Sequence, residues 1–272
     1  MKRIGLLGCG AIGTQIAIAI DTGIIHAQLT HIFDSDKKNA ENLITKLKQK
    51  PIIVENVHLL SSNPVDLIVE AASQQAVSDN ALSILQNRRD LMIMSAGALL
   101  DESVFEIISD ACKEFKKTVY LPSGAISGLD AIKSVKNELD YVTITTTKHP
   151  KSLEGAKFFE TSTLDLDNIS TSTTIFEGTA SEAVRLFPKN VNVSALLSLA
   201  GLGSHETIVK VVADPNIDKN IHQIESKGKF GKISTTVENV PDPSNPKTSR
   251  LATLSAIETL RSICSDGIKI GT

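Results

Sequence analysis

The feature that most constrains this chain is a glycine run between an apolar segment and a helical one. Residues Gly8–Gly13 read GCGAIG; they follow Arg3–Leu7, which has strand character, and open Ala11–Ile20, whose apolar residues recur at helical spacing. In such a unit the three glycines permit a tight turn, the approach of a pyrophosphate, and close packing of helix on strand. The N–H groups of the first helical turn attract phosphate. The run predicts a dinucleotide site formed by Gly8, Gly10, Ala11, Ile12 and Gly13.

An acidic residue about 20 residues beyond the run supports this prediction. Asp34 ends the second strand-like segment, Leu29–Phe33. A carboxylate there accepts hydrogen bonds from the ribose 2′-hydroxyl and repels a 2′-phosphate, so NAD is favoured over NADP. Lys37 and Lys38 are close enough to bind a 2′-phosphate, which leaves NADP open as the alternative.

The pattern of elements predicts an α/β chain of two domains. Up to residue 121, short strand-like runs alternate with helical patterns, which is typical of βαβ units on a parallel sheet. From residue 122 to 245, longer Thr-rich segments such as Tyr141–Thr147 alternate in polarity, which indicates an open, largely antiparallel mixed sheet. We expect the first part to be a Rossmann domain and the second to bind substrate and form the dimer contact.

A proline-rich break at Val240–Pro246 precedes a final helical pattern, which we assign with residues 246–272 to the first domain. Thr248 or Ser249 is the expected N-cap. The apolar stripe needs a surface to cover it, and the first domain is the simplest choice. Its members are Leu251, Leu254, Ile257, Leu260 and Ile263.

Two loops of small residues follow further strands of the first part. Ligands of open parallel sheets bind at the carboxyl ends of strands, and small side chains leave room there for a ribose and a nicotinamide. The cofactor contacts predicted from these loops are Ala71, Ala72, Ser95 and Ala96.

Composition excludes several other classes. Aromatic residues make up 4% of the chain, Trp is absent, and the formal charge is −3, which argues against a nucleic-acid partner. The three cysteines are far apart without a CxxC, so we expect no disulfide framework, no metal site and a reducing cytoplasm. Met1-Lys-Arg3 imitates an export signal, but the apolar run before Cys9 is too short for one, and no membrane span is expected. Metalloprotease, P-loop and nucleophile-elbow motifs are lacking.

Six histidines compete for an acid–base role. An ordinary imidazole suits proton transfer near neutral pH. His205 and His222 fall in the second domain, and position alone does not separate them, although His222 opens a short strand-like segment after an acidic loop.

Several longer stretches resemble the L-aspartate dehydrogenase family over essentially the whole length. Besides the glycine run and Ser95–Ala98, they are Pro122–Asp130, Phe187–Ser194, Val212–Pro215, Asn220–His222 and Asn245–Ser249. The resemblance implies that His222 is catalytic and that Ala125 and Asn192 contact the cofactor. Where the family usually has Glu and Ala, this chain has Gln223 and Ser194, so the pKa of His222 becomes the open question.

The resemblance also implies a fold and an activity. The fold is a Rossmann domain, a second domain with an open sheet, and a C-terminal helix returning to the first, in a homodimer. The activity is NAD(P)-dependent oxidation of L-aspartate to iminosuccinate, then oxaloacetate and ammonia, with iminosuccinate passing to quinolinate synthase for NAD biosynthesis. For the two substrate carboxylates, the motifs offer Arg185, Lys189, Lys247 and Thr248.

Two other kinds of function compete. One is a related dehydrogenase or reductase of the homoserine or dihydrodipicolinate type, although the paired histidines expected of the latter are absent. Glucose-fructose oxidoreductase relatives would show E-K-P where this chain has Ser95-Ala-Gly. The other kind is a non-catalytic NAD-sensing protein, which would bind NADH without aspartate-dependent turnover.

Overall fold

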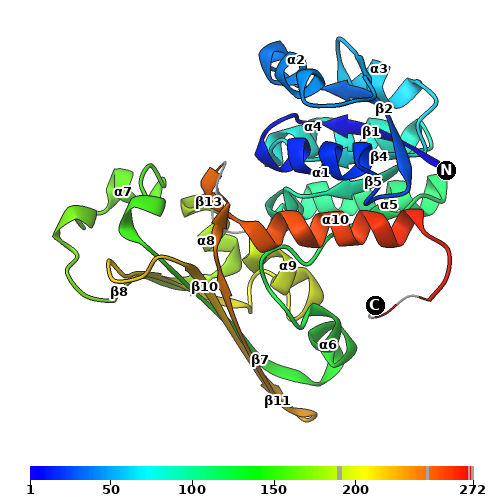
Figure 1. Cartoon of the computed structure of the whole chain (residues 1–272). Coiled ribbons are helices and arrows are strands. Elements are labelled where there is room, and N and C mark those ends of the chain that lie inside the picture. The colour runs from blue at the N-terminus through cyan, green and yellow to red at the C-terminus, as the bar shows by residue number, and fades with distance from the viewer. Residues whose placement is uncertain (189–191, 243–244, 269, 271–272) are drawn as a thin grey trace. The chain divides into compact units, whose positions relative to one another are not determined.

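The computed structural model divides the chain into two compact units (Figure 1). The first comprises Met1–Pro122 and Thr253–Ile270, and the second comprises Ser123–Ala252. The structure describes residues 1–188, 192–242, 245–268 and 270, and for residues 245–248 it describes the backbone alone.

The first unit is built on a six-stranded parallel sheet in the order β3-β2-β1-β4-β5-β6. Short crossovers with helices connect the strands, which is why their sequences read as buried apolar runs without alternation. The strands are β1 (Lys2–Leu7), β2 (Ala27–Phe33), β3 (Ile52–Ile53), β4 (Leu67–Glu70), β5 (Asp90–Ile93) and β6 (Val119–Tyr120).

The helices of this unit start at side-chain caps in several cases. Ser73 caps α4, and Asp101 caps α5 by accepting from the N–H groups of Ser103 and Val104. No side chain caps α1, which begins directly after Gly10. The helices are α1 (Ala11–Asp21), α2 (Lys37–Thr45), α3 (Val57–Ser62), α4 (Gln74–Gln86), η1 (Ala96–Leu100), α5 (Glu102–Phe115) and α10 (Arg250–Cys264).

The C-terminal helix α10 packs on the first unit, as predicted (Figure 1). Ala256 and Leu260 belong to the core cluster that α1, α2 and the central strands form. The predicted apolar stripe is partly wrong, because Leu254 is 48% exposed and Thr253 is buried in its place. The buried residues Thr253, Ala256 and Leu260 recur at helical spacing, and Leu254 lies beside that row on the exposed side.

The second unit contains a five-stranded mixed sheet in the order β11-β10-β7-β9-β8. Three neighbouring pairs are antiparallel and β7–β9 is parallel, so the sheet is open and largely antiparallel, as predicted. The strands are β7 (Leu139–Lys148), β8 (Thr173–Thr179), β9 (Ile208–Ala213), β10 (Asn220–Gly228) and β11 (Gly231–Asn239); β12 (Pro241–Asp242) and β13 (Asn245–Ser249) form a separate ladder.

Short helices accompany this sheet. They are α6 (Leu129–Ser134), α7 (Phe158–Thr161), α8 (Ala180–Leu186) and α9 (Asn192–Ala200), with single turns at η2 (Lys136–Glu138), η3 (Pro150–Ser152) and η4 (Leu166–Asn168). Helix α8 starts at a capping box formed by Thr179 and Glu182. In the described part of the chain, no helix has both the length and the apolar content to cross a bilayer.

One sequence prediction of element length needs correction. The segment that His222 was expected to open as a short strand is a nine-residue strand, β10, with His222 at its third position. In the first unit, helix α2 ends at Thr45, and beyond it the backbone amides of Lys48 and Gln49 donate to the Asp21 carboxylate.

Candidate active site

The glycine loop between β1 and α1 has the geometry that its spacing predicted. Gly8 has φ +99°, and a Cβ there would lie 2.5 Å from the carbonyl oxygen of Ala71. A Cβ on Gly13 would overlap the carbonyl oxygen of Gly8. At both positions only glycine fits, because backbone packs directly on backbone.

Gly10 differs from its two neighbours in the run. A Cβ built on it would meet no atom within 4 Å, and its φ of −70° is open to any residue. The helix that starts here carries no acidic residue in its first turn. Open space beside an uncapped helix N-terminus is the cradle that a pyrophosphate fills, so the residues present fit a dinucleotide.

Asp34 directly follows β2, and its carboxylate accepts hydrogen bonds that fix the glycine loop. Its Oδ2 accepts the backbone N–H of Cys9 at 2.7 Å, and its Oδ1 accepts from the N–H of Asp36 at 2.8 Å and from Asn39 Nδ2 at 3.3 Å. The carboxylate is half-buried and next to the cradle, where the 2′-hydroxyl of a ribose would meet it. Lys37 and Lys38 are exposed.

Cys9 lies inside this loop but has no chemical role. Burial, with the nearby Asp34 charge, raises the pKa of its thiol to about 12. The thiolate is the reactive form of cysteine, so this side chain is a small apolar filler.

Glu70, at the carboxyl end of β4, is a residue whose role the sequence did not indicate. It is 1% exposed. Its oxygens accept from the N–H groups of Ala72 at 2.8 Å, Met94 at 3.1 Å and Ser95 at 3.0 Å, and from the Ser95 hydroxyl at 2.8 Å. Burial raises the pKa of Glu70, while the donors, led by the Ser95 amide, oppose that rise.

Glu70 therefore ties together the two small-residue loops predicted as cofactor contacts. Ala71 and Ala72 stay partly or fully exposed at this edge, whereas Ser95 and Ala96 are buried. Both polar donors of Ser95 are directed at Glu70. A glutamate ending a buried apolar strand was the available signal, because a buried carboxylate needs several donors.

The polar groups of the second unit gather at one end of the covered face of its sheet. His222 on β10 is paired in register with Thr146 on β7, and the two side chains meet at 3.0 Å between Nδ1 and Oγ1. Both are buried. The same face continues as Ile144 and Ile224 in the next row, so the polar end borders an apolar core.

The pKa of His222, which the sequence left open, differs strongly from that of an ordinary imidazole. Burial, with the charge of Lys148, lowers the pKa of His222 to about 3. The ring is therefore neutral at physiological pH and has a lone pair at the nitrogen that Thr146 does not contact, but the lowered pKa makes it a weaker base than an ordinary imidazole. Gln223 is exposed and follows His222 in the strand, so the two side chains point to opposite faces of the sheet. The replacement of the family's usual Glu by Gln at this position therefore removes no carboxylate from the face that holds the imidazole.

The remaining predicted residues are placed as follows. Ala125 is buried, and its carbonyl accepts from Asn239 Nδ2 at 3.0 Å. Asn192 is the first residue of α9. His205 and Arg185 are exposed. Lys189 lies outside the described residues, as do the side chains of Lys247 and Thr248, whose backbone belongs to β13.

Lys148 is a further buried residue that sequence reasoning missed. It follows Thr146 by two positions on β7, shares its covered face, and is 4% exposed. Burial lowers the pKa of its ammonium to about 8. The available signal was the alternation of β7, which places residue 148 on the same covered face as Ile144 and Thr146, so that the pattern predicts a buried side chain there.

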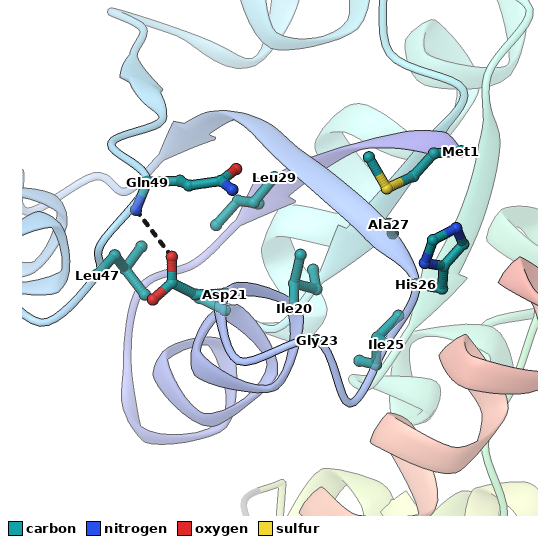
Figure 2. Close-up of a pocket in the computed structure, with 11 residues that line it drawn as sticks. Met1, Ile20, Asp21, Gly23, Ile25, His26, Ala27, Leu29, Leu47 and Gln49 are labelled. Carbon is teal, nitrogen blue, oxygen red and sulfur yellow. Dashed lines mark hydrogen bonds between the residues drawn. The ribbon is translucent and has the colours of Figure 1, made fainter.

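The first unit contains a hollow, and Figure 2 shows the residues that line it. Its lining includes Met1, Ile25 and His26 before the amino ends of β1 and β2, Asp21 at the end of α1, and Gln49 in the segment after α2. The Asp21 carboxylate accepts from the amides of Lys48 and Gln49, which lowers its pKa. The hollow lies near the amino ends of β1 and β2, at the opposite edge of the sheet from the glycine run. Among the residues described, no group of His, Cys, Asp or Glu could hold a metal.

Comparisons with known proteins agree with this arrangement. The family model "Homoserine dehydrogenase, NAD binding domain" matches residues 8–122, and "Aspartate dehydrogenase, C-terminal" matches residues 130–263. The first unit therefore binds a pyridine nucleotide. A crystal structure of scyllo-inositol dehydrogenase from Lactobacillus casei with NAD(H), 14% identical, covers 96% of this chain and 88% of its own with a TM-score of 0.58, which shows the shared fold.

Two groups of relatives are much nearer. The L-aspartate dehydrogenases of Nitrosopumilus maritimus and Methanococcoides burtonii are 66% and 48% identical, each over 100% of both chains. The crystal structure of aspartate dehydrogenase from Thermotoga maritima has 30% identity and a TM-score of 0.76, and covers 99% of both chains. With its two family models and its full-length relatives, this chain belongs to the L-aspartate dehydrogenase family of oxidoreductases.

Proposed function

We propose that this chain oxidises L-aspartate to iminosuccinate with NAD, and that iminosuccinate then hydrolyses to oxaloacetate and ammonia. The observation that carries the proposal is the neutral, buried His222 held by Thr146, in a chain whose full-length relatives are L-aspartate dehydrogenases. A neutral imidazole is the form that can accept the proton released when an amine becomes an imine.

The first unit would hold the cofactor. Gly8, Gly10, Ala11, Ile12 and Gly13 would hold the pyrophosphate, Asp34 the ribose, and Ala71, Ala72, Ser95 and Ala96 the side of the nicotinamide. The family resemblance implies Ala125 and Asn192 as further cofactor contacts. When bound, the nicotinamide supplies the hydride acceptor for the hydrogen on the substrate Cα. We propose NAD as the preferred form because of the Asp34 carboxylate, with NADP as the alternative that Lys37 and Lys38 would allow.

His222 would handle the proton. As Cα loses its hydride, the C–N bond becomes double and the nitrogen loses a proton, which His222 Nε2 accepts. This requires Nδ1–H to donate to Thr146 Oγ1, so that the lone pair lies on Nε2. In the hydrolysis that follows, the same nitrogen can accept a proton from the attacking water once it has released the first.

Other parts of the proposal rest on the family resemblance. We propose a homodimer, with iminosuccinate passing to quinolinate synthase in NAD biosynthesis. Lys189, Lys247 and Thr248 stay candidates for contact with the substrate carboxylates. A cytoplasmic location is proposed from the spacing of the three cysteines, none of which forms a disulfide among the residues that the structure describes.

The test is a spectrophotometric assay of NADH formation with NAD and L-aspartate. Homoserine and other amino acids serve as competing substrates, and NADP as the competing cofactor. We expect the largest kcat/KM for L-aspartate with NAD. Tight NADH binding without aspartate-dependent turnover would instead favour a nucleotide-sensing protein, and a preference for homoserine would favour a homoserine dehydrogenase.

A further inference from the structure

A row of buried polar side chains lies beside His222 at the end of the second sheet. Asn220 on β10 is paired with Asn239 on β11, and both are nearly fully buried. Since Thr146 is paired with His222 in an antiparallel register, Lys148 comes level with Asn220, two residues along each strand. Alternation places Lys148, Asn220 and Asn239 on the same face as His222.

We propose that Lys148 binds a carboxylate of the substrate at this end of the sheet, next to His222. The proposal rests on the proposed oxidation of L-aspartate and assigns one of its two carboxylates to a named cation. Lys148 thereby becomes a substrate-binding residue in addition to the candidates that the motifs provided.

The burial of the ammonium is the first argument. Among the residues whose exposure the structure describes, Lys148 is the only buried lysine or arginine. Taking an ammonium out of water is costly, and an aliphatic side chain of the same length would fill the space without that cost. A buried ammonium therefore costs stability even where the fold gives it a partner, and contact with a substrate anion would account for its retention. A pKa of about 8 leaves the side chain mainly charged at neutral pH, as an anion-binding role requires.

The second argument is an acceptor in the same row that lacks a partner. Asn239 Nδ2 donates to the Ala125 carbonyl at 3.0 Å, which sets the orientation of the amide. Its Oδ1 is buried and has no hydrogen-bond partner. Buried polar atoms normally have one, so an open acceptor in a buried row indicates a ligand with N–H groups. An amino dicarboxylate offers such groups together with the anion for Lys148.

The neighbourhood of His222 supports the same assignment. The charge of Lys148 contributes to the lowered pKa of His222, so the two side chains interact electrostatically. An anion bound at Lys148 would stand next to the group that takes the proton from the substrate amine. In aspartate the α-carboxylate and the amine share one carbon, and the second carboxylate is one carbon further on.

The experiment compares Lys148→Met with Lys148→Arg. Methionine keeps the length without the charge, and we expect KM for L-aspartate to rise about 100-fold, the scale on which loss of one partner of a buried ion pair acts. Arginine should recover at least a tenth of the lost kcat/KM, since the charge returns. NADH affinity, measured by fluorescence titration, should stay within twofold. Exposed Lys151, three residues on, provides the matched control Lys151→Met, whose KM should not change.

A second readout does not depend on turnover. Succinate has the two carboxylates without the amine, and it should raise the melting temperature of the NADH complex of the wild type but not that of Lys148→Met. Circular dichroism of both proteins establishes that the variant is folded. If it is not, Lys148→Arg and Lys148→Gln take its place in the same comparison.

Three outcomes would overturn the assignment. An unchanged KM with equal protection by succinate would make Lys148 a structural lysine. A loss confined to kcat, with KM unchanged, would mean that it acts on His222 rather than on the carboxylate. If Lys148→Arg recovers no kcat/KM while succinate still raises the melting temperature of Lys148→Met as much as that of the wild type, Lys148 likewise does not bind the carboxylate. A wild type that does not oxidise L-aspartate removes the proposed function itself, independently of the variants.

Discussion

The two units bring polar groups to the ends of their sheets in different ways. At the cofactor edge of the first unit, the groups are backbone amides, held in place by the buried Glu70 and by Asp34. At the polar end of the second, they are titratable side chains, His222 and Lys148, with pKa values of about 3 and about 8. The first arrangement suits a charged ligand of fixed shape, and the second suits chemistry in which protons move.

The difference also separates what substitution should do in each unit. A backbone site is disturbed by adding atoms, because every substitution except proline leaves its N–H donors in place. A side-chain site is disturbed by removing atoms. Variants of the two kinds should therefore divide into losses of cofactor affinity and losses of turnover.

The largest effect should come from His222→Ala. Removing the proton acceptor should lower kcat about 1,000-fold, within the range that positioned general bases contribute, while NADH affinity stays near that of the wild type. Exposed His205, the other histidine considered in this domain, provides the matched control His205→Ala. Near-wild-type turnover by His222→Ala would exclude the residue as the base, and a loss in His205→Ala would move the assignment there.

The next effect should come from Gly10→Ala. The added methyl meets no protein atom, so stability should not change, but it occupies the space that a pyrophosphate needs. We expect KM for NAD to rise about 100-fold with kcat less affected, as for a displacement of about 1 Å. Gly13→Ala is the contrast, since its methyl overlaps the Gly8 carbonyl and should lower the melting temperature as well. An unchanged KM for NAD in Gly10→Ala would show that the phosphates bind elsewhere.

A smaller effect is expected from Glu70→Gln, which tests how the cofactor edge is held. The amide replaces one acceptor by a donor facing N–H groups, which should cost about 2 kcal/mol of unfolding free energy and roughly 6 °C in melting temperature. KM for NAD should rise modestly because both loops loosen. Calorimetry and kinetics together check this, with exposed Glu106→Gln as control. A melting temperature equal to that of the wild type would show that Glu70 is protonated and already donates.

The same contrast explains what the sequence could predict. The glycine run is contiguous, and its strand, turn and helix are local, so the cofactor loop followed from the spacing of Gly8, Gly10 and Gly13. The His222 contact joins residues 76 positions apart, and only the register of β7 and β10 brings them together. Single-sequence patterns contain no register, so the contact between Thr146 and His222 was not identified. Glu70 and Lys148 were missed although their places at the ends of strands were a signal. His222 itself was selected by resemblance rather than by its surroundings.

The C-terminal helix illustrates the same limit within the first unit. The apolar periodicity of residues 251–263 predicted that the helix packs back on this unit, and Leu260 is buried as expected. It did not predict that Thr253 would be buried and Leu254 exposed, because helical periodicity defines a face only to within a residue. The packing partner, not the helix, decides which edge of that face is covered.

The smallest predicted effect concerns pH and stability in the second unit. In the folded chain the pKa of His222 is about 3, below its ordinary value of 6.5, so the unfolded chain binds the proton first as pH falls. Between those values the unfolded state holds more protons, and stability therefore falls as the pH is lowered below 6.5. From pH 7.5 to 5.5 this linkage amounts to about 1 kcal/mol.

Denaturant unfolding of the wild type and His222→Gln should show the difference, since the other titrating groups are common to both. His58→Gln, at an exposed histidine of the first unit, should follow the wild type. Parallel pH curves for the wild type and His222→Gln would mean that folding does not lower the pKa of His222, and would contradict a buried imidazole that stays neutral down to pH 5.5.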